Sequence, residues 1–300
     1  MKETHIRQSF LGEYSEQTLK ELRVGVIGLC GGGSHIVQQL SHVGIGNLLI
    51  VDPDRIDLSN LNRLVGATYQ DAQAKRLKIE IAERTAKAVN PSVNLTARAK
   101  PWSEVIEELR DCDIIVGCLD SYSQRTQLEA FCRRFLIPYI DLGMDVHEVG
   151  DHYVVSGQVA RSIPGDVCLQ CMGIITEDDV AKEAYGVAGG RPQVVWPNGL
   201  LASAAVGLLI EMVTPWYKSK RSSEFLTYNG NDQSLMRHNW MKISTTRTCS
   251  HYPANEVGDP HPFWIAQEKK TSETQRTTKS SFFRRFLLKG CKTTLKIFNF

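Results

Sequence analysis

The chain has 300 residues, a net charge of +2 and 42% hydrophobic residues. This length can bury a substantial core in one large domain or two small ones. The nearly balanced charge gives no sign of a nucleic-acid-binding surface on the body of the protein.

Residues 1–5 are not followed by an apolar signal segment, so we expect a cytoplasmic protein. No apolar stretch is expected to reach the roughly 18 residues that a transmembrane helix needs. Eight cysteines in such a chain are typical of free thiols and metal ligands in a reducing compartment, not of a disulfide framework.

Strand and helix patterns alternate through the first half of the chain. Residues 12–22 have the pattern of a short amphipathic helix. We then expect strands at 24–28, 47–52, 93–98, 113–117 and 137–141, separated by helices at 33–43, 71–89, 102–110 and 122–135. This alternation predicts an α/β fold with a Rossmann-like, mostly parallel sheet and helices on both of its faces.

The pattern changes after residue 143. Residues 153–159 are rich in β-branched residues and predict a strand, so we expect antiparallel strands to extend the sheet. Residues 197–213 predict a strongly apolar helix that is fully buried or packed against another subunit.

The last part of the chain is markedly basic. From residue 269 onward it has nine Lys or Arg and one acid, Glu273. We therefore expect a domain over residues 1–267 and a basic, flexible tail over residues 268–300. The tail is either solvated disorder or a docking segment for an acidic carrier, a partner enzyme or a membrane surface.

A glycine-rich turn follows the first predicted strand and contains Gly28, Gly31 and Gly33. Backbone N–H groups at a helix start hold phosphate, and glycines let the phosphate approach them closely. Asp52 ends the next strand, where an acid would hold ribose hydroxyls. Taken alone, these features also fit a nicotinamide oxidoreductase. We interpret Cys30 within the turn as a small tolerated side chain and not as a redox group.

The polar segment after Asp52 separates these alternatives. Asn60 and Arg63 follow it on a loop or helix start beside the glycine turn. A guanidinium there can hold phosphate with two hydrogen bonds and stabilise the charge that builds up in phosphoryl or nucleotidyl transfer. Hydride transfer has no need of such a group. The competing interpretation of Arg63 is a surface ion pair.

The sequence resembles the ThiF/MoeB/ubiquitin-activating adenylyltransferases from residue 6 to about residue 215. The glycine turn matches with one substitution, at Cys30, and the segment from Asp52 to Arg63 matches without interruption. The other matching features are Arg7-Gln8, Asp54 within the second motif, Lys78 ahead of Asn90-Pro91, and Gly117-Cys118-Leu119-Asp120-Ser121 followed by Arg125.

The resemblance implies ATP-dependent adenylation of the C-terminal carboxylate of a small ubiquitin-like or sulfur-carrier protein. It implies a phosphate cradle at the three glycines, ribose binding by Asp52, and a nucleotide site that includes Asp54. Phosphate contacts are implied for Asn60, Arg63 and Lys78, with Lys75 as the alternative lysine. Asp120 would hold Mg²⁺, although it could also be an ordinary helix N-cap. Arg7 would reach the nucleotide site of a second subunit, which implies a homodimer.

The resemblance also implies a structural zinc site that begins with Cys168 and Cys171. The second cysteine pair of the family is absent, and Cys249 and His251 stand there instead. Three thiolates and one imidazole are a suitable tetrahedral set for Zn²⁺, so we predict these four residues as ligands. The alternative is that the metal has been lost and the cysteines are ordinary thiols.

Residues 173–200 contain no cysteine, although many family members carry one there that receives the carrier as a thioester. Cys30, Cys249 or Cys291 would have to serve, so the thiol step and a conjugating enzyme as partner stay open. Two rival functions share the scaffold. One is an enzyme that acts on tRNA or a short peptide, and the other is a non-catalytic partner subunit of an activating enzyme.

Overall fold

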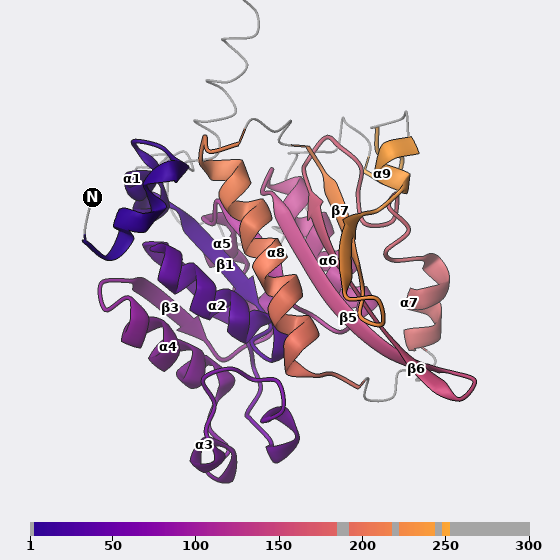
Figure 1. The fold of residues 1–300 in the computed structure, drawn as a ribbon, viewed down its shortest axis with the longest axis horizontal. Helices are drawn as coiled ribbons and strands as arrows, with labels where there is room; N and C mark the ends of the chain where they lie inside the picture. Colours follow the sequence, from indigo (N-terminus) through magenta and orange to yellow (C-terminus); the bar gives the residue numbers. More distant parts are fainter. Residues whose placement is uncertain (1–2, 185–191, 218–221, 244–247, 253–300) are drawn as a thin grey trace, which may run out of the picture.

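The computed structural model describes residues 3–184, 192–217, 222–243 and 248–252. Its strands form one sheet in the order β3-β2-β1-β4-β5-β6-β7-β8. The first five strands pair in parallel, and β6, β7 and β8 continue the sheet in antiparallel pairs. The predicted α/β class with a mostly parallel sheet and an antiparallel extension is therefore confirmed (Figure 1).

The strands lie close to their predicted positions, except that β5 and β6 are longer and form a hairpin. Their bounds are β1 (Arg23–Ile27), β2 (Asn47–Val51), β3 (Asn94–Arg98), β4 (Ile114–Gly117), β5 (Tyr139–Val149), β6 (His152–Ser162), β7 (Glu224–Asn229) and β8 (Ser234–Arg237).

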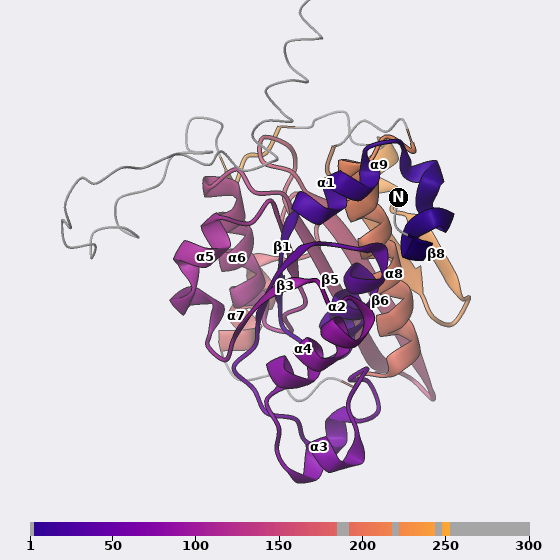
Figure 2. The same cartoon turned by 90° about the vertical axis from the view of Figure 1, so that its left-hand side faces the viewer.

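Helices cover both faces of the sheet. Figure 2 shows α2, α4 and α8 on one side of the strands and α5, α6 and α7 on the other. The helices are α1 (Ser15–Glu21), α2 (Gly31–Val43), α3 (Tyr69–Gln73), α4 (Lys78–Val89), α5 (Ile106–Arg110), α6 (Tyr122–Arg134), α7 (Glu177–Ala184), α8 (Val195–Val213) and α9 (Trp240–Ile243). The described residues also form the 3₁₀ helices η1 (Glu3–Leu11), η2 (Leu58–Asn60) and η3 (Trp102–Glu104).

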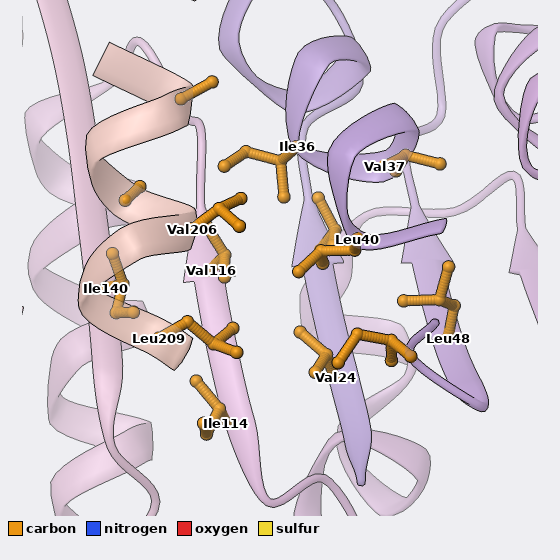
Figure 3. Close-up of a cluster of buried hydrophobic side chains, with 14 of the residues drawn as sticks. Val24, Ile36, Val37, Leu40, Leu48, Ile114, Val116, Ile140, Val206 and Leu209 are labelled. Carbon is orange, nitrogen blue, oxygen red and sulfur yellow. The ribbon is translucent and has the colours of Figure 1, made fainter. Parts of the chain in front are cut away.

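The larger hydrophobic core lies between the sheet and the helices α2 and α8. Val24 and Val116 point from neighbouring strands toward Leu40 of α2 and toward Val206 and Leu209 of α8 (Figure 3). Strand residues alternate between the two faces, so Ile27 and Leu49 instead join the second core under α5 and α6. This packing fixes the carboxyl ends of the parallel strands, where the polar motifs begin.

The prediction of a single helix over residues 71–89 is wrong. The chain forms α3 and then α4, with Lys75 between them at a φ of 49°, in the left-handed region. The backbone N–H of Ile56 donates to the carbonyl of Arg76, which ties the break to the segment after β2. Lys78 consequently lies in the first turn of α4 and faces that segment.

Two other predicted helices are shorter than expected. The stretch 12–22 contains α1 only from Ser15, after the 3₁₀ helix η1. The stretch 102–110 is divided into η3 and α5. Residues 268–300, predicted as a basic tail, lie outside the described residues, so the domain boundary at residue 267 stays a prediction.

Helix α8 corrects one expectation drawn from hydropathy. Among the described residues it is the one helix that is long and apolar enough to cross a membrane by length and composition. Core helices of soluble proteins pass the same test, and 56% of the apolar window is buried inside the protein. Helix α8 packs on α2 and on the strands β5 and β6, and we interpret it as a core helix.

Candidate active site and metal cluster

A cavity of about 1280 Å³ opens at the carboxyl ends of β1, β2 and β4. The sheet order places β2 and β4 on opposite sides of β1, so the connections from β1 and β4 leave toward opposite faces. Such a switch point is the usual binding crevice of doubly wound sheets. Eight predicted nucleotide-site residues line this cavity: Gly28, Gly31, Asp52, Asp54, Asn60, Arg63, Lys78 and Asp120.

The glycine turn is shaped by close backbone approach. Gly28 has a φ of 84°, and a Cβ there would lie 2.6 Å from the carbonyl oxygen of Cys118. At Gly33 a Cβ would lie 1.8 Å from the carbonyl oxygen of Gly28. Gly33 therefore closes the turn from behind and does not line the cavity, so its predicted part in the phosphate cradle is indirect.

Asp52 is buried at the end of β2 and forms hydrogen bonds with both the glycine turn and the segment that follows β2. One carboxylate oxygen accepts the N–H of Leu29 at 2.7 Å, and the other accepts the N–H of Asp54 at 2.8 Å. Burial raises the pKa of Asp52, although Lys78 and the two N–H groups oppose this shift. Each carboxylate oxygen keeps a second lone pair, which leaves capacity for ribose hydroxyls from the cavity.

Lys78 is buried beside these two carboxylates. Its Nζ lies 2.7 Å from Oδ2 of Asp54 and 3.9 Å from Oδ1 of Asp52. Burial alone would lower the pKa of Lys78, but the carboxylates outweigh it and the pKa is raised. Lys75 is exposed, pairs with Asp57 and does not line the cavity. The geometry therefore favours Lys78 over Lys75 as the phosphate-contacting lysine.

Arg63 has an incompletely paired guanidinium. Its Nη1 donates to the carbonyl of Ser59 at 2.8 Å and to Oδ1 of Asn62 at 3.0 Å. Its Nε is buried and has no hydrogen-bond partner among the residues that the structure describes. These residues also give it no carboxylate within salt-bridge distance, so the surface ion pair that we considered is not found there.

The segment around Arg63 is kept in place by local hydrogen bonds. Oδ1 of Asn60 accepts the backbone N–H of Asp57 at 3.1 Å, and its amide NH₂ has no acceptor among the described residues and can donate into the cavity. The backbone N–H of Arg63 donates to the carbonyl of Asn60 at 3.0 Å. The predicted phosphate-binding segment is thus a tight turn with its polar groups at the cavity.

Asp120 is exposed at the cavity, directly before α6. The expectation that it could be the N-cap is wrong, because Ser121 is the N-cap and its hydroxyl accepts the N–H of Gln124 at 3.2 Å. Within the described part of the chain the Asp120 carboxylate forms no hydrogen bond or salt bridge, so it is available to a cation. Arg7 is also exposed, on η1, but it does not line the cavity of its own chain.

A buried ion pair that the sequence does not reveal lies at the cavity. Arg125 of α6 lines the cavity, and its Nε donates to Oδ1 of Asp141 at 3.0 Å while its Nη2 contacts the other oxygen. Tyr139 donates its hydroxyl to the same carboxylate at 2.9 Å. The buried amide of Asn198, from α8, lies over Gly31 at the same cavity.

The four predicted metal ligands lie together away from this cavity. Their ligand atoms are all within 4.8 Å of one another. The Nδ1 of His251 is 3.4 Å from the Cys168 sulfur and 3.3 Å from the Cys171 sulfur. The Cys171 sulfur is 3.6 Å from Cys168 and 3.7 Å from Cys249. Tetrahedral coordination with bonds of about 2.0–2.3 Å places ligand atoms about 3.3–3.8 Å apart, so the cluster has the dimensions of a metal site.

The thiols of Cys171 and Cys168 have pKa values shifted in opposite directions. Burial would raise the pKa of Cys171, but hydrogen bonds from the backbone and from His251 and the neighbouring thiols lower it to about 7. Burial raises the pKa of Cys168. Metal binding requires thiolates, so a bound cation would displace the protons from the thiols that hold it.

Helix α6 connects the cluster to the cavity. Glu129 is fully buried and accepts the N–H of Leu169 at 3.0 Å. Arg133 donates to the carbonyl groups of Asp166 and Val167, and its guanidinium lies 5.1 Å from the ring centre of Tyr252. Glu129 and Arg133 thus contact the chain at two points of the cluster, one next to Cys168 and the other next to His251.

Comparisons with known proteins agree with this architecture. Ubiquitin-like modifier-activating enzyme 5 of Rattus norvegicus is 26% identical over 180 residues, covering 55% of this chain and 42% of the relative. Molybdopterin-synthase adenylyltransferase of Haemophilus influenzae is 34% identical over 127 residues, covering 42% of this chain and 51% of the relative. This chain therefore spans about half the length of the curated relatives that it matches.

Among solved structures, E. coli MccB with ATP has the same fold, with a TM-score of 0.66 at 18% identity. The match covers 79% of this chain and 71% of MccB. The model of the ThiF family matches residues 3–250, which is most of the chain and includes the cavity and the three cysteines of the metal cluster. The chain belongs to the ThiF family.

Proposed function

We propose that this protein adenylates the C-terminal carboxylate of a ubiquitin-like or sulfur-carrier protein with ATP. The observation that carries the proposal is the buried Nε of Arg63, which has no partner among the described residues and lies at the cavity that is also lined by Lys78, Asp120 and the glycine turn. A buried donor without a partner is costly, so its presence at this cavity supports an anionic ligand there.

The chemistry fits the residues. The carrier carboxylate would attack the α-phosphorus of ATP, forming an acyl-adenylate and releasing pyrophosphate. Arg63 would donate hydrogen bonds to the phosphate oxygens, and Lys78 would place its ammonium beside them. The N–H groups of the glycine turn would contact phosphate at the start of α2, and Asp52 would hold the ribose. Mg²⁺ held by Asp120 would supply further positive charge when bound.

Adenylation of the carrier requires no covalent intermediate with a side chain of the protein. Cys30 lines the cavity, whereas Cys249 belongs to the metal cluster and Cys291 lies outside the described residues. We therefore propose adenylation alone, and a thioester and a conjugating enzyme stay open. Arg7 is proposed to complete the site of a second subunit in a homodimer, and the cytoplasm stays the predicted location.

We further propose structural Zn²⁺ at Cys168, Cys171, Cys249 and His251. The distances within the cluster and its sulfur-rich donor set support this metal. The cluster brings the chain after β6 together with residues 249–251, which are about eighty positions later in the sequence. A bound metal would cross-link these two parts of the chain.

The function is tested by ATP–pyrophosphate exchange. Purified protein is mixed with the β-grasp proteins of the same genome that end in Gly-Gly, and in parallel with tRNA and with short peptides. Exchange that depends on a Gly-Gly-ending protein supports the proposal. Exchange that depends only on tRNA or a peptide would replace it with the corresponding rival, and no exchange under any condition would favour a non-catalytic subunit.

The choice between the two lysines gives a separate prediction. Lys78→Ala should lower kcat/KM in the exchange assay about 30- to 100-fold, because it removes a buried ammonium beside the proposed phosphate site. Lys75→Ala, which removes an exposed ammonium three residues earlier, should stay within about threefold of the wild type. Equal losses in the two variants would contradict the assignment of Lys78.

A further inference from the structure

The segment between the metal cluster and α8 touches the cavity at both of its described ends. Ile174 lines the cavity at one end. Gln193 lines it at the other, where its carbonyl accepts the side-chain amide of Asn62 at 2.9 Å. Helix α7 lies between these ends and packs Val180 on the core beside α6. Described residues on both sides of α7 in the sequence therefore line the proposed nucleotide site.

Glu183 of α7 binds the N-terminus of α6. Its carboxylate accepts the hydroxyl of Ser121 at 3.1 Å, the N–H of Tyr122 at 3.1 Å and the N–H of Ser123 at 2.9 Å. A carboxylate at this end of a helix is also favoured by the helix dipole. One side chain thus fixes three consecutive residues of another element, some sixty positions earlier in the sequence.

This contact completes the hydrogen bonding of the helix start. The N–H of Gln124 donates to the Ser121 hydroxyl at 3.2 Å, and the N–H of Arg125 donates to the Ser121 carbonyl at 3.0 Å. With Glu183 on the preceding two N–H groups, the first four donors of α6 are all satisfied. The N-terminus of α6 is therefore occupied by the carboxylate of Glu183.

Asp120 immediately precedes these residues. Its carboxylate has no hydrogen-bond partner among the described residues, so the backbone of the turn alone sets its position. We propose that Glu183 is a positioning residue, which holds the Ser121–Ser123 backbone so that Asp120 presents its carboxylate to Mg²⁺·ATP. The inference rests on the proposed function and adds a link from α7 to the cation side of the nucleotide site.

The test is nucleotide binding by the full-length protein, measured calorimetrically with ATP in Mg²⁺ and with ATP in EDTA. Glu183→Ala should raise the Kd for ATP in Mg²⁺ about tenfold, as is typical when the support of a metal ligand is removed. It should leave the Kd in EDTA within about twofold. Glu183→Gln keeps one acceptor oxygen and should give an intermediate Kd in Mg²⁺.

Two further variants make the test specific. Glu177→Ala removes an exposed carboxylate from the same helix and should bind ATP like the wild type under both conditions. In an Asp120→Asn background, Glu183→Ala should have little additional effect, because its action passes through Asp120. Melting temperatures identify a variant that fails to fold, and in that case the comparison uses Glu183→Gln.

The possible failures are distinct. A wild-type protein that binds no ATP overturns the proposed function and this inference together. A wild-type protein that binds ATP, with a folded Glu183→Ala or Glu183→Gln variant that binds it equally well in Mg²⁺, overturns this inference alone. Equal weakening in Mg²⁺ and EDTA would also overturn it, because that pattern indicates a general structural role.

Discussion

Replacing Arg63 by alanine should reduce kcat/KM for carrier-dependent ATP–pyrophosphate exchange about a hundred- to thousandfold. The guanidinium has a buried Nε without a partner among the described residues, and its Nη1 is anchored by Ser59 and Asn62. Such a preorganised donor stabilises charge that develops on the phosphates, and removal of one comparable donor typically costs about 3–4 kcal/mol. The rate is measured by incorporation of labelled pyrophosphate into ATP.

Arg63→Lys separates charge from geometry. A lysine keeps the positive charge but lacks the planar fork of donors, so we expect an activity between those of the wild type and Arg63→Ala. Arg55→Ala is the matched control, because its Nη1 donates to the Lys75 carbonyl and its side chain is exposed at the rim of the cavity. Exchange by Arg63→Ala at the wild-type rate would refute the proposed site.

Loss of the metal should have the largest effect on stability. We expect about one zinc per chain, and chelation should lower the melting temperature by about 5–15 °C. This range corresponds to a few kcal/mol in a domain of this size, since structural zinc contributes directly to folding. Metal content is measured by elemental analysis and the melting temperature by calorimetry. A purified protein with less than about 0.2 zinc per chain would reject the site.

Two substitutions at one ligand give an internal control. His251→Ala leaves three thiols and should lose most of the zinc together with the stability that it provides. His251→Cys creates a four-cysteine set, which is equally suited to tetrahedral zinc, and should retain the metal. Cys30→Ala removes a thiol outside the cluster and should leave the zinc content unchanged. Retention of zinc by His251→Ala would show that the imidazole is not a ligand.

Much of the fold and the cavity could be predicted because the signals are local. Strand periodicity places Asp52 at the end of β2, and parallel strands bring such ends to one edge of the sheet. The sequence does not reveal the break before α4, because Lys75 adopts a positive φ without glycine or asparagine to mark the position. A prediction of one continuous helix through Lys75 therefore does not tell in which direction the side chain of Lys78 points.

The remaining features depend on contacts between distant parts of the chain. The ion pair of Arg125 and Asp141 joins a helix to the neighbouring strand, and no local pattern distinguishes it from an exposed pair. The contact of Glu183 with α6 likewise cannot be predicted from local sequence patterns. The grouping of the four predicted metal ligands could be predicted despite a separation of about eighty residues, because the family resemblance implies a second ligand pair near the C-terminus and Cys249 and His251 are residue types that bind zinc.

The buried pair of Glu129 and Arg133 has a consequence for sequence variation. Glu129 is enclosed by protein, and burial raises its pKa although Arg133 opposes this shift. Removing either partner alone would leave the other buried without its counter-charge, at a cost of about 3–5 kcal/mol, whereas exchanging both for neutral side chains can be nearly neutral. Among relatives of this protein, the acid and the base at these two positions should therefore be gained and lost together.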